Sequence, residues 1–132
     1  MERKNENCRI LIVDDDGDLC QILNMILRDI CRIQIEHTLK AASDYLAGAD
    51  LNLSQLILLL DNNLPDGDGV DYIPAIRSLS PAIKVVLMTA DQTPGIADHA
   101  ISMGADLFLP KPLAVAAIKK HILTICPELS AA

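Results

Sequence analysis

Residues 56–69, LILLLDNNLPDGDG, do most to decide the fold of this chain. Five apolar residues end at a carboxylate, Asp61, and residues typical of a turn follow it. A short apolar run closed by a turn favours a strand buried on both faces, as in a parallel sheet covered by helices. Ligands of such sheets bind beyond the carboxyl ends of the strands, where Asp61 would lie. A single acid could equally be a solvated turn residue, so whether Asp61 is functional depends on which residues end the other strands.

Strand and helix patterns alternate along the rest of the chain. Further strands are predicted at residues 9–13, 33–36, 83–88 and 107–109. Apolar spacing predicts helices from Leu19 to about Ile30 with Asp16 as N-cap, over residues 39–49 and 113–125, and near residues 70–79, where Pro74 would cause a kink outside the first turn. Another helix is expected from Pro94, capped by Thr93, to just before Gly104. Five such units predict one α/β domain, a doubly wound (βα)5 parallel sheet.

Composition limits the classes of function. The 132 residues suit one domain, and neither an apolar run of about 18 residues nor a signal-peptide pattern is present, so a soluble, cytosolic protein is expected with no membrane contact. The net charge is −7 and only three residues are aromatic, which argues against direct binding of nucleic acid.

Cysteines and histidines are scattered without metal-type spacing. We expect reduced, partly buried thiols rather than a zinc site or disulfides for Cys8, Cys20, Cys31 and Cys126. The histidines are expected on the surface or at the rim of a site: His37, His99 and His121. Acids of turns and helix starts are expected at Asp66, Asp68 and Asp71.

Four predicted strand ends carry chemically useful groups, namely Asp14 with Asp15, Asp61, Thr89 and Lys111. Right-handed crossovers bring these ends to one edge of the sheet. Converging carboxylates would repel one another and raise a pKa, a cost that a hard cation such as Mg²⁺ removes. Acids, a metal, a hydroxyl and a lysine together can stabilise a phosphoryl group in transfer, with a carboxylate as its acceptor.

These motifs resemble the receiver domain of bacterial two-component response regulators over nearly the whole chain. The matching residues are Asp14-Asp15, then Asp61-x-x-Leu64-Pro65 with Gly69, then Met88-Thr89-Ala90, and finally Lys111-Pro112. The resemblance implies a flavodoxin-like strand order 2-1-3-4-5, a receiver over residues 1–126, and a C-terminal tail at residues 127–132.

The resemblance also implies residue roles. Asp61 would be the phosphoacceptor, and Mg²⁺ would be bound by Asp15, Asp61 and the backbone carbonyl of Asn63, with Asp14 assisting through water. Thr89 and Lys111 would contact phosphoryl oxygens, which makes them the catalytic groups beside Asp61.

Four further features follow from the same resemblance. Lys111-Pro112 would be a cis peptide. Phe108 would swing inward when Thr89 moves, although core packing explains a Phe at this position equally well. Asn63 and Asp91 would border the path of the attacking water, and their short side chains predict a transient phosphoprotein.

The resemblance predicts a switch rather than an enzyme with an external substrate. Its donor would be a histidine kinase or a phosphotransfer protein, and its output a separate protein or a fused output domain. The polar start of the chain suggests that the receiver lies at the true N-terminus. Kinase identity, output and oligomeric state are not encoded in any motif.

One alternative starts from the same acidic cluster. Asp14-Asp15-Asp16-Gly17-Asp18-Leu19 is similar to the first motif of haloacid-dehalogenase-type phosphatases, in which Asp14 would be the nucleophile and Asp16 the acid/base. Against it, Asp18 stands where that motif has Thr, no acidic pair follows Lys111, and the chain is short for such an enzyme.

Overall fold

A central parallel sheet organises the protein. The computed structural model describes residues 8–50 and 55–131. Within these ranges the main sheet has five strands: β1 (Cys8–Val13), β2 (Arg32–Glu36), β3 (Gln55–Asp61), β6 (Lys84–Thr89) and β7 (Leu107–Pro110). All neighbours pair in parallel, in the order β2-β1-β3-β6-β7. Numbered among themselves these strands read 2-1-3-4-5, so the predicted topology is confirmed.

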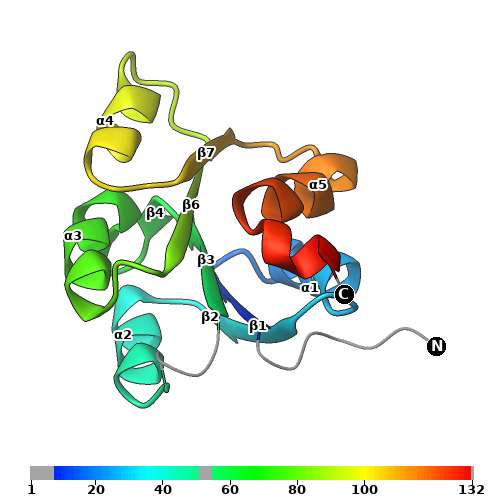
Figure 1. The fold of residues 1–132 in the computed structure, drawn as a ribbon. Helices are drawn as coiled ribbons and strands as arrows, with labels where there is room; N and C mark the ends of the chain where they lie inside the picture. The colour runs from blue at the N-terminus through cyan, green and yellow to red at the C-terminus, as the bar shows by residue number, and fades with distance from the viewer. Residues whose placement is uncertain (1–7, 51–54, 132) are drawn as a thin grey trace.

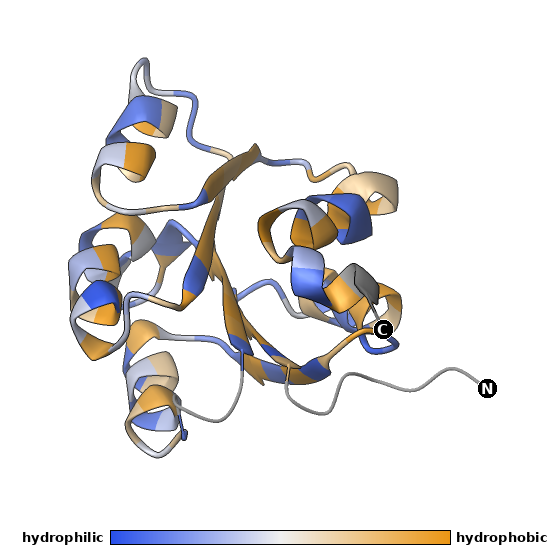
Figure 2. Ribbon diagram, viewed as in Figure 1, coloured by the Kyte–Doolittle hydropathy of each residue, from blue (hydrophilic) through white to orange (hydrophobic). Residues whose placement is uncertain are grey.

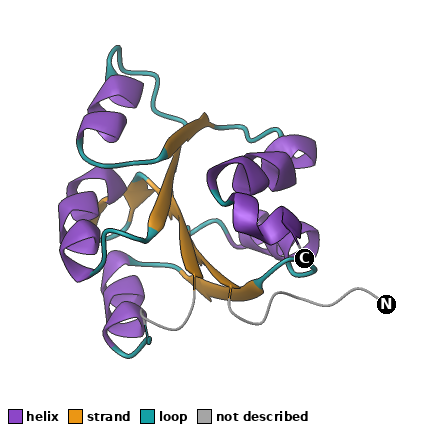
Figure 3. Ribbon diagram, in the orientation of Figure 1, coloured by secondary structure: helices purple, strands orange, loops and turns teal. Residues whose placement is uncertain are grey.

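Helices cover both faces of this sheet (Figures 1 and 3). One face carries α1 (Gly17–Leu27) and α5 (Val115–Ile125), followed by a short 3-10 helix, η1 (Pro127–Ala131). The other face carries α2 (Leu39–Ala47), α3 (Gly69–Leu79) and α4 (Ile96–Ser102). A small antiparallel pair that the sequence did not predict, β4 (Asn63–Leu64) with β5 (Gly67–Asp68), lies between β3 and α3.

Central strands are buried on both faces, as the apolar run before Asp61 predicted. In β1, Ile10 and Ile12 pack toward α1 and α5, whereas Leu11 and Val13 pack toward the opposite helices. In β3 every side chain from Leu56 to Leu60 is at most 5% exposed. Figure 2 shows the resulting hydrophobic sheet between helices of mixed polarity. Burial of both faces fixes the register, and with it the place of the polar residues at the strand ends.

Local signals predicted the helices in part. Asp16 is the N-cap of α1 as predicted, because its Oδ1 accepts hydrogen bonds from the backbone N–H groups of Asp18 (3.1 Å) and Leu19 (3.2 Å). Pro74 lies inside α3, beyond its first turn, which is the position where the sequence predicted a kink. The helices α2 and α5 are each two residues shorter than predicted, since α2 ends at Ala47 and α5 begins at Val115.

The predicted start of α4 was wrong. The helix begins at Ile96, not at Pro94, and its N-cap is Gly95, whose φ of 85° is left-handed. Thr93 is engaged elsewhere, since its N–H and its hydroxyl both donate to Asp91 Oδ1, at 2.8 and 2.5 Å. A turn, closed by the Ile96 N–H on Thr93 O at 3.1 Å, therefore precedes the helix.

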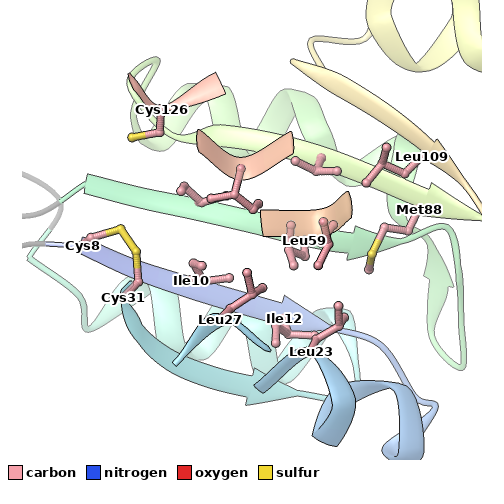
Figure 4. Packing of buried hydrophobic residues seen from close by; sticks show 14 of the residues in the cluster. Cys8, Ile10, Ile12, Leu23, Leu27, Cys31, Leu59, Met88, Leu109 and Cys126 are labelled. Carbon is pink, nitrogen blue, oxygen red and sulfur yellow. A yellow bond between two sulfur atoms is a disulfide. The ribbon is translucent and has the colours of Figure 1, made fainter. Parts of the chain in front are cut away.

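The expectation of four reduced cysteines was also wrong. Cys8 and Cys31 form a disulfide with a Cα–Cα distance of 5.0 Å, shown in Figure 4, and both residues are 0% exposed. The fold places the start of β1 beside the residue that precedes β2, a proximity that cysteine spacing alone does not reveal. Cys20 and Cys126 are buried free thiols as expected, and burial raises the pKa of each to about 11.

Candidate functional site

Three carboxylates meet at the carboxyl ends of β1 and β3. Asp14 and Asp15 directly follow β1, and Asp61 is the last residue of β3. Asp14 is 0% and Asp61 4% exposed, whereas Asp15 is open to solvent. One oxygen from each of the three lies within 4.8 Å of the others. This donor set fits a hard divalent cation, because oxygen ligands and negative charge are what Mg²⁺ requires.

Lys111 supplies the positive charge of the site. Its Nζ lies 2.7 Å from Asp14 Oδ2 and 3.4 Å from Asp61 Oδ1. The Lys111 N–H donates to Thr89 O at 2.8 Å, which ties the end of β7 to the end of β6. The peptide bond between Lys111 and Pro112 is cis, as predicted.

Thr89 stands beside the carboxylates on the neighbouring strand. Asp61 is paired with Met88 across β3 and β6, and Thr89 is the next residue of β6. Thr89 is 1% exposed, and its Oγ1 accepts a hydrogen bond from the Asp91 N–H at 3.0 Å. Because Thr89 Oγ1 is only an acceptor in that bond, the Thr89 hydroxyl proton can be donated to an anion at Asp61.

The buried charges shift one another's protonation. Burial, and secondly the charge of Asp14, raise the pKa of the Asp61 carboxyl, while Lys111 and the Asn63 N–H act in the opposite direction. Burial by itself lowers the pKa of Lys111. The contacts of the ammonium with Asp14 and Asp61 outweigh this effect, so the pKa of Lys111 is raised. The site therefore holds a lysine that stays charged beside a carboxylate that is costly to ionise.

Asn62 is a structural residue of the site that sequence reasoning missed. It is 4% exposed, and its N–H donates to Met88 O at 2.9 Å. Its backbone O and its Oδ1 accept from the N–H groups of Gly69 (2.8 Å) and Val70 (2.9 Å). Asn62 thus caps α3 and fixes the chain directly after Asp61. The available signal was an amide directly after the strand-end acid and shortly before a helix.

The backbone carbonyl of Asp14 has two side-chain partners that were not predicted. Cys20 Sγ donates to it at 3.3 Å, and His37 Nδ1 lies 2.8 Å from it. His37 is exposed at the rim of the site, as expected. These contacts hold the Asp14 backbone from α1 and from the segment after β2.

Other predicted acids have structural roles. Asp66 accepts hydrogen bonds from the N–H groups of Leu39 (2.8 Å) and Lys40 (2.9 Å) at the start of α2, which lowers its pKa. Asp68 is the N-cap residue of α3, and Asp71 lies in the first turn of that helix. Asp16 is occupied as the N-cap of α1, and Asp14 is buried and paired with Lys111.

Asn63, Asp91 and Phe108 surround this centre. Asn63 is exposed in β4, and its N–H bonds the Asp61 carboxyl. Asp91 is half-buried, and its hydrogen bonds from Thr93 lower its pKa. Phe108 lies in β7, opposite Leu87 of β6. It is half-buried and packs against the core beneath α2, α3 and α4.

Comparison with known proteins decides the family. The sequence model of the response regulator receiver domain matches residues 10–123. The chain is a response regulator receiver domain. It is similar to the response regulator protein PilR of Pseudomonas aeruginosa, with 31% identity over 88% of this chain and 25% of PilR. The receiver domain therefore spans about a quarter of that relative.

Solved structures agree with the assignment. This receiver domain is similar to a two-component response regulator from Clostridium difficile, with a TM-score of 0.79 and 27% identity over 89% of this chain and 94% of that one. It is also similar to the beryllofluoride-activated NtrC4 receiver domain dimer, with a TM-score of 0.81 and 30% identity over 92% and 98% of the two chains. Among the described residues of the receiver domain, no helix has the length and apolar character needed to cross a membrane.

Proposed function

We propose that this receiver domain accepts a phosphoryl group on Asp61 and thereby switches a protein-interaction surface. The observation that carries the proposal is the position of Asp61, which is buried beside Asp14, 3.4 Å from the Lys111 ammonium and next to the strand end that bears Thr89. A carboxyl group whose pKa is raised by burial and by a neighbouring like charge is typical of functional sites, and this one stands at the carboxyl end of a parallel strand, where ligands of such sheets bind.

The donor would be a phosphohistidine of a histidine kinase or of a phosphotransfer protein. An Asp61 carboxylate oxygen would form a bond to phosphorus while the bond from phosphorus to the histidine nitrogen breaks. The imidazole keeps the electron pair of that bond, and an acyl phosphate remains on Asp61. Lys111 and the Thr89 hydroxyl would contact the phosphoryl oxygens and stabilise their charge.

Asp15 and Asp61, with the Asn63 carbonyl and with Asp14 through water, would hold Mg²⁺. When bound, this ion would neutralise charge on the phosphoryl oxygens and on the carboxylates.

The output would depend on Thr89 and Phe108. A phosphoryl dianion on Asp61 attracts the Thr89 hydroxyl, and Phe108 follows into the space that Thr89 leaves. This shift would bias the surface of β6, α4, β7 and α5 between two states. A downstream protein or a fused output domain would read that surface, and the chain would act as a switch in the cytoplasm rather than as an enzyme for an external substrate.

Labelling with a small-molecule phosphodonor and Mg²⁺ tests the site. The wild type and the control Asp68→Asn, an exposed acid whose side chain makes no cap bond, should gain one phosphoryl group by mass spectrometry. Asp61→Asn should gain none. Labelling that persists in Asp61→Asn but disappears in Asp14→Asn would support the phosphatase alternative. Unchanged spectra of Thr89 and Phe108 with beryllofluoride and Mg²⁺ would instead indicate an interaction module without a phosphorylation switch.

The lifetime of the phosphorylated state should depend on Asn63 and Asp91. Both side chains are short, so water should reach the acyl phosphate and hydrolysis should be fast. Bulky substitutions at both positions should slow the loss of phosphate, measured after the donor is removed. An unchanged hydrolysis rate in the double variant would contradict this role.

A further inference from the structure

A polar pocket lies at the amino-terminal end of β1 and β2, far from the carboxylates. Its volume is about 280 Å³, and it is lined by Arg9, Arg32, Ile33, Gln34 and Tyr45. Arg9 precedes Asp14 by five residues, so at the rise of a strand these two residues are about 16 Å apart. The pocket is therefore separate from the site of the proposed phosphoryl transfer.

Two arginines stand side by side at this pocket. Arg9 and Arg32 are direct partners in the β1–β2 register. The next pair, Ile10 and Ile33, packs toward α1 and α5, so alternation turns both arginines toward α2. Like charges directly opposite each other destabilise a sheet. In a chain with a net charge of −7, such a pair is a local concentration of positive charge.

The polar groups around the arginines leave room for an anion. Arg9 Nη1 donates to the Tyr45 hydroxyl at 3.1 Å, which holds the guanidinium between β1 and α2. Arg32 has an interaction of its own, but a guanidinium has five N–H donors. Asp44, the residue before Tyr45 on α2, lies 3.2 Å from Lys40 and is not among the residues that line the pocket.

We propose that this pocket binds a small phosphate-type oxyanion, such as inorganic phosphate or pyrophosphate. Guanidinium groups bind such anions through pairs of parallel hydrogen bonds, and the Tyr45 hydroxyl adds a neutral partner. The Gln34 amide, which also lines the pocket, already donates to Glu36 Oε2 at 2.7 Å. The volume is at the lower limit of ligand pockets, which suits a compact anion better than a nucleotide. The anion would bridge β1 and β2 at their amino-terminal ends.

Calorimetric titration of the full chain with phosphate and pyrophosphate tests this site. Low ionic strength and EDTA keep Mg²⁺ and the Asp61 site out of the measurement. Saturable binding is expected, and Arg9→Gln and Arg32→Gln should each weaken it about tenfold or more, the effect of one lost charge-assisted hydrogen bond. The matched control Lys120→Gln removes the same charge from an exposed position of α5 and should change affinity less than about twofold.

Amide chemical shifts locate the anion independently of the variants. Pyrophosphate should shift the resonances of Ile33, Gln34 and Tyr45 and leave those around Asp61 unchanged. No saturable binding, an equal loss in Lys120→Gln, or shifts confined to the Asp61 region would each overturn the proposal. Tighter binding of succinate than of pyrophosphate would overturn the phosphate assignment.

Discussion

Replacing Gly69 by alanine should disturb Asp61 directly. Gly69 begins α3, and its N–H donates to Asn62 O at 2.8 Å. An alanine Cβ here would lie 2.9 Å from Leu60 Cγ and closer still to the backbone O of Asp61, whereas real Cβ contacts essentially never fall below 3.0 Å. The obstacle is the backbone of the proposed phosphoacceptor, so the end of β3 or the start of α3 has to move.

The expected cost follows from overpacking of a buried site. Such substitutions destabilise by about 1–3 kcal/mol. For a chain of 132 residues this lowers the midpoint of thermal unfolding by about 4–11 °C. Because Asp61 itself is displaced, phosphorylation by a small-molecule donor should also be slower in Gly69→Ala, even at temperatures where the variant is fully folded.

Gly17 provides the matched control. An alanine Cβ at this first residue of α1 would meet nothing within 4 Å, so Gly17→Ala should be neutral or stabilise by about 0.5 kcal/mol. Both variants are compared by thermal unfolding and by the rate of labelling. If Gly69→Ala matches the wild type in both measurements, the close approach of α3 to Asp61 is not as described.

Two further predictions concern stability. Asp61→Asn should raise the free energy of unfolding at pH 7: burial raises the pKa of this carboxyl above 3.8, so its ionisation costs stability at higher pH. The gain should shrink as the pH falls toward 3.8, and a gain independent of pH in urea titrations would contradict the electrostatic cause. Reduction of the Cys8–Cys31 disulfide should lower the free energy of unfolding by about 3 kcal/mol, because the bond closes a loop with a sequence separation of 23. The double variant Cys8→Ala/Cys31→Ala should show no effect of reductant on its urea midpoint, whereas an unchanged midpoint in the wild type would exclude the disulfide.

Periodicity and strand ends predicted most of the fold because both are local signals. Each predicted strand of the main sheet exists, with ends within one residue of those expected. Once parallel pairing is assumed, the last residues of these strands must meet at one edge, and Asp14, Asp61 and Lys111 do so. The cluster could thus be predicted without any side-chain geometry, whereas its individual roles came from resemblance to a family.

The failures of prediction arise where tertiary contacts override a local signal. Thr93 is a good cap by residue type, yet it forms hydrogen bonds to Asp91 instead, and α4 begins only at Ile96. Cys8 and Cys31 lack any motif spacing, and only the pairing of β1 with β2, in which Arg9 lies opposite Arg32, brings them together. Asn62 was overlooked because its partners, Gly69 and Val70, become neighbours only through the turn after β3.

The charge balance of the site explains the choice of a lysine at position 111. Two buried carboxylates share one ammonium, which is 2.7 Å from Asp14 and 3.4 Å from Asp61. A phosphoryl group on Asp61 would add negative charge on the Asp61 side of the ammonium. The ammonium would then have to move toward Asp61 and still neutralise Asp14. A compact, mobile point charge suits such redistribution, whereas the planar fork of an arginine would favour one fixed carboxylate. The unequal distances thus describe the unphosphorylated balance that phosphorylation would shift.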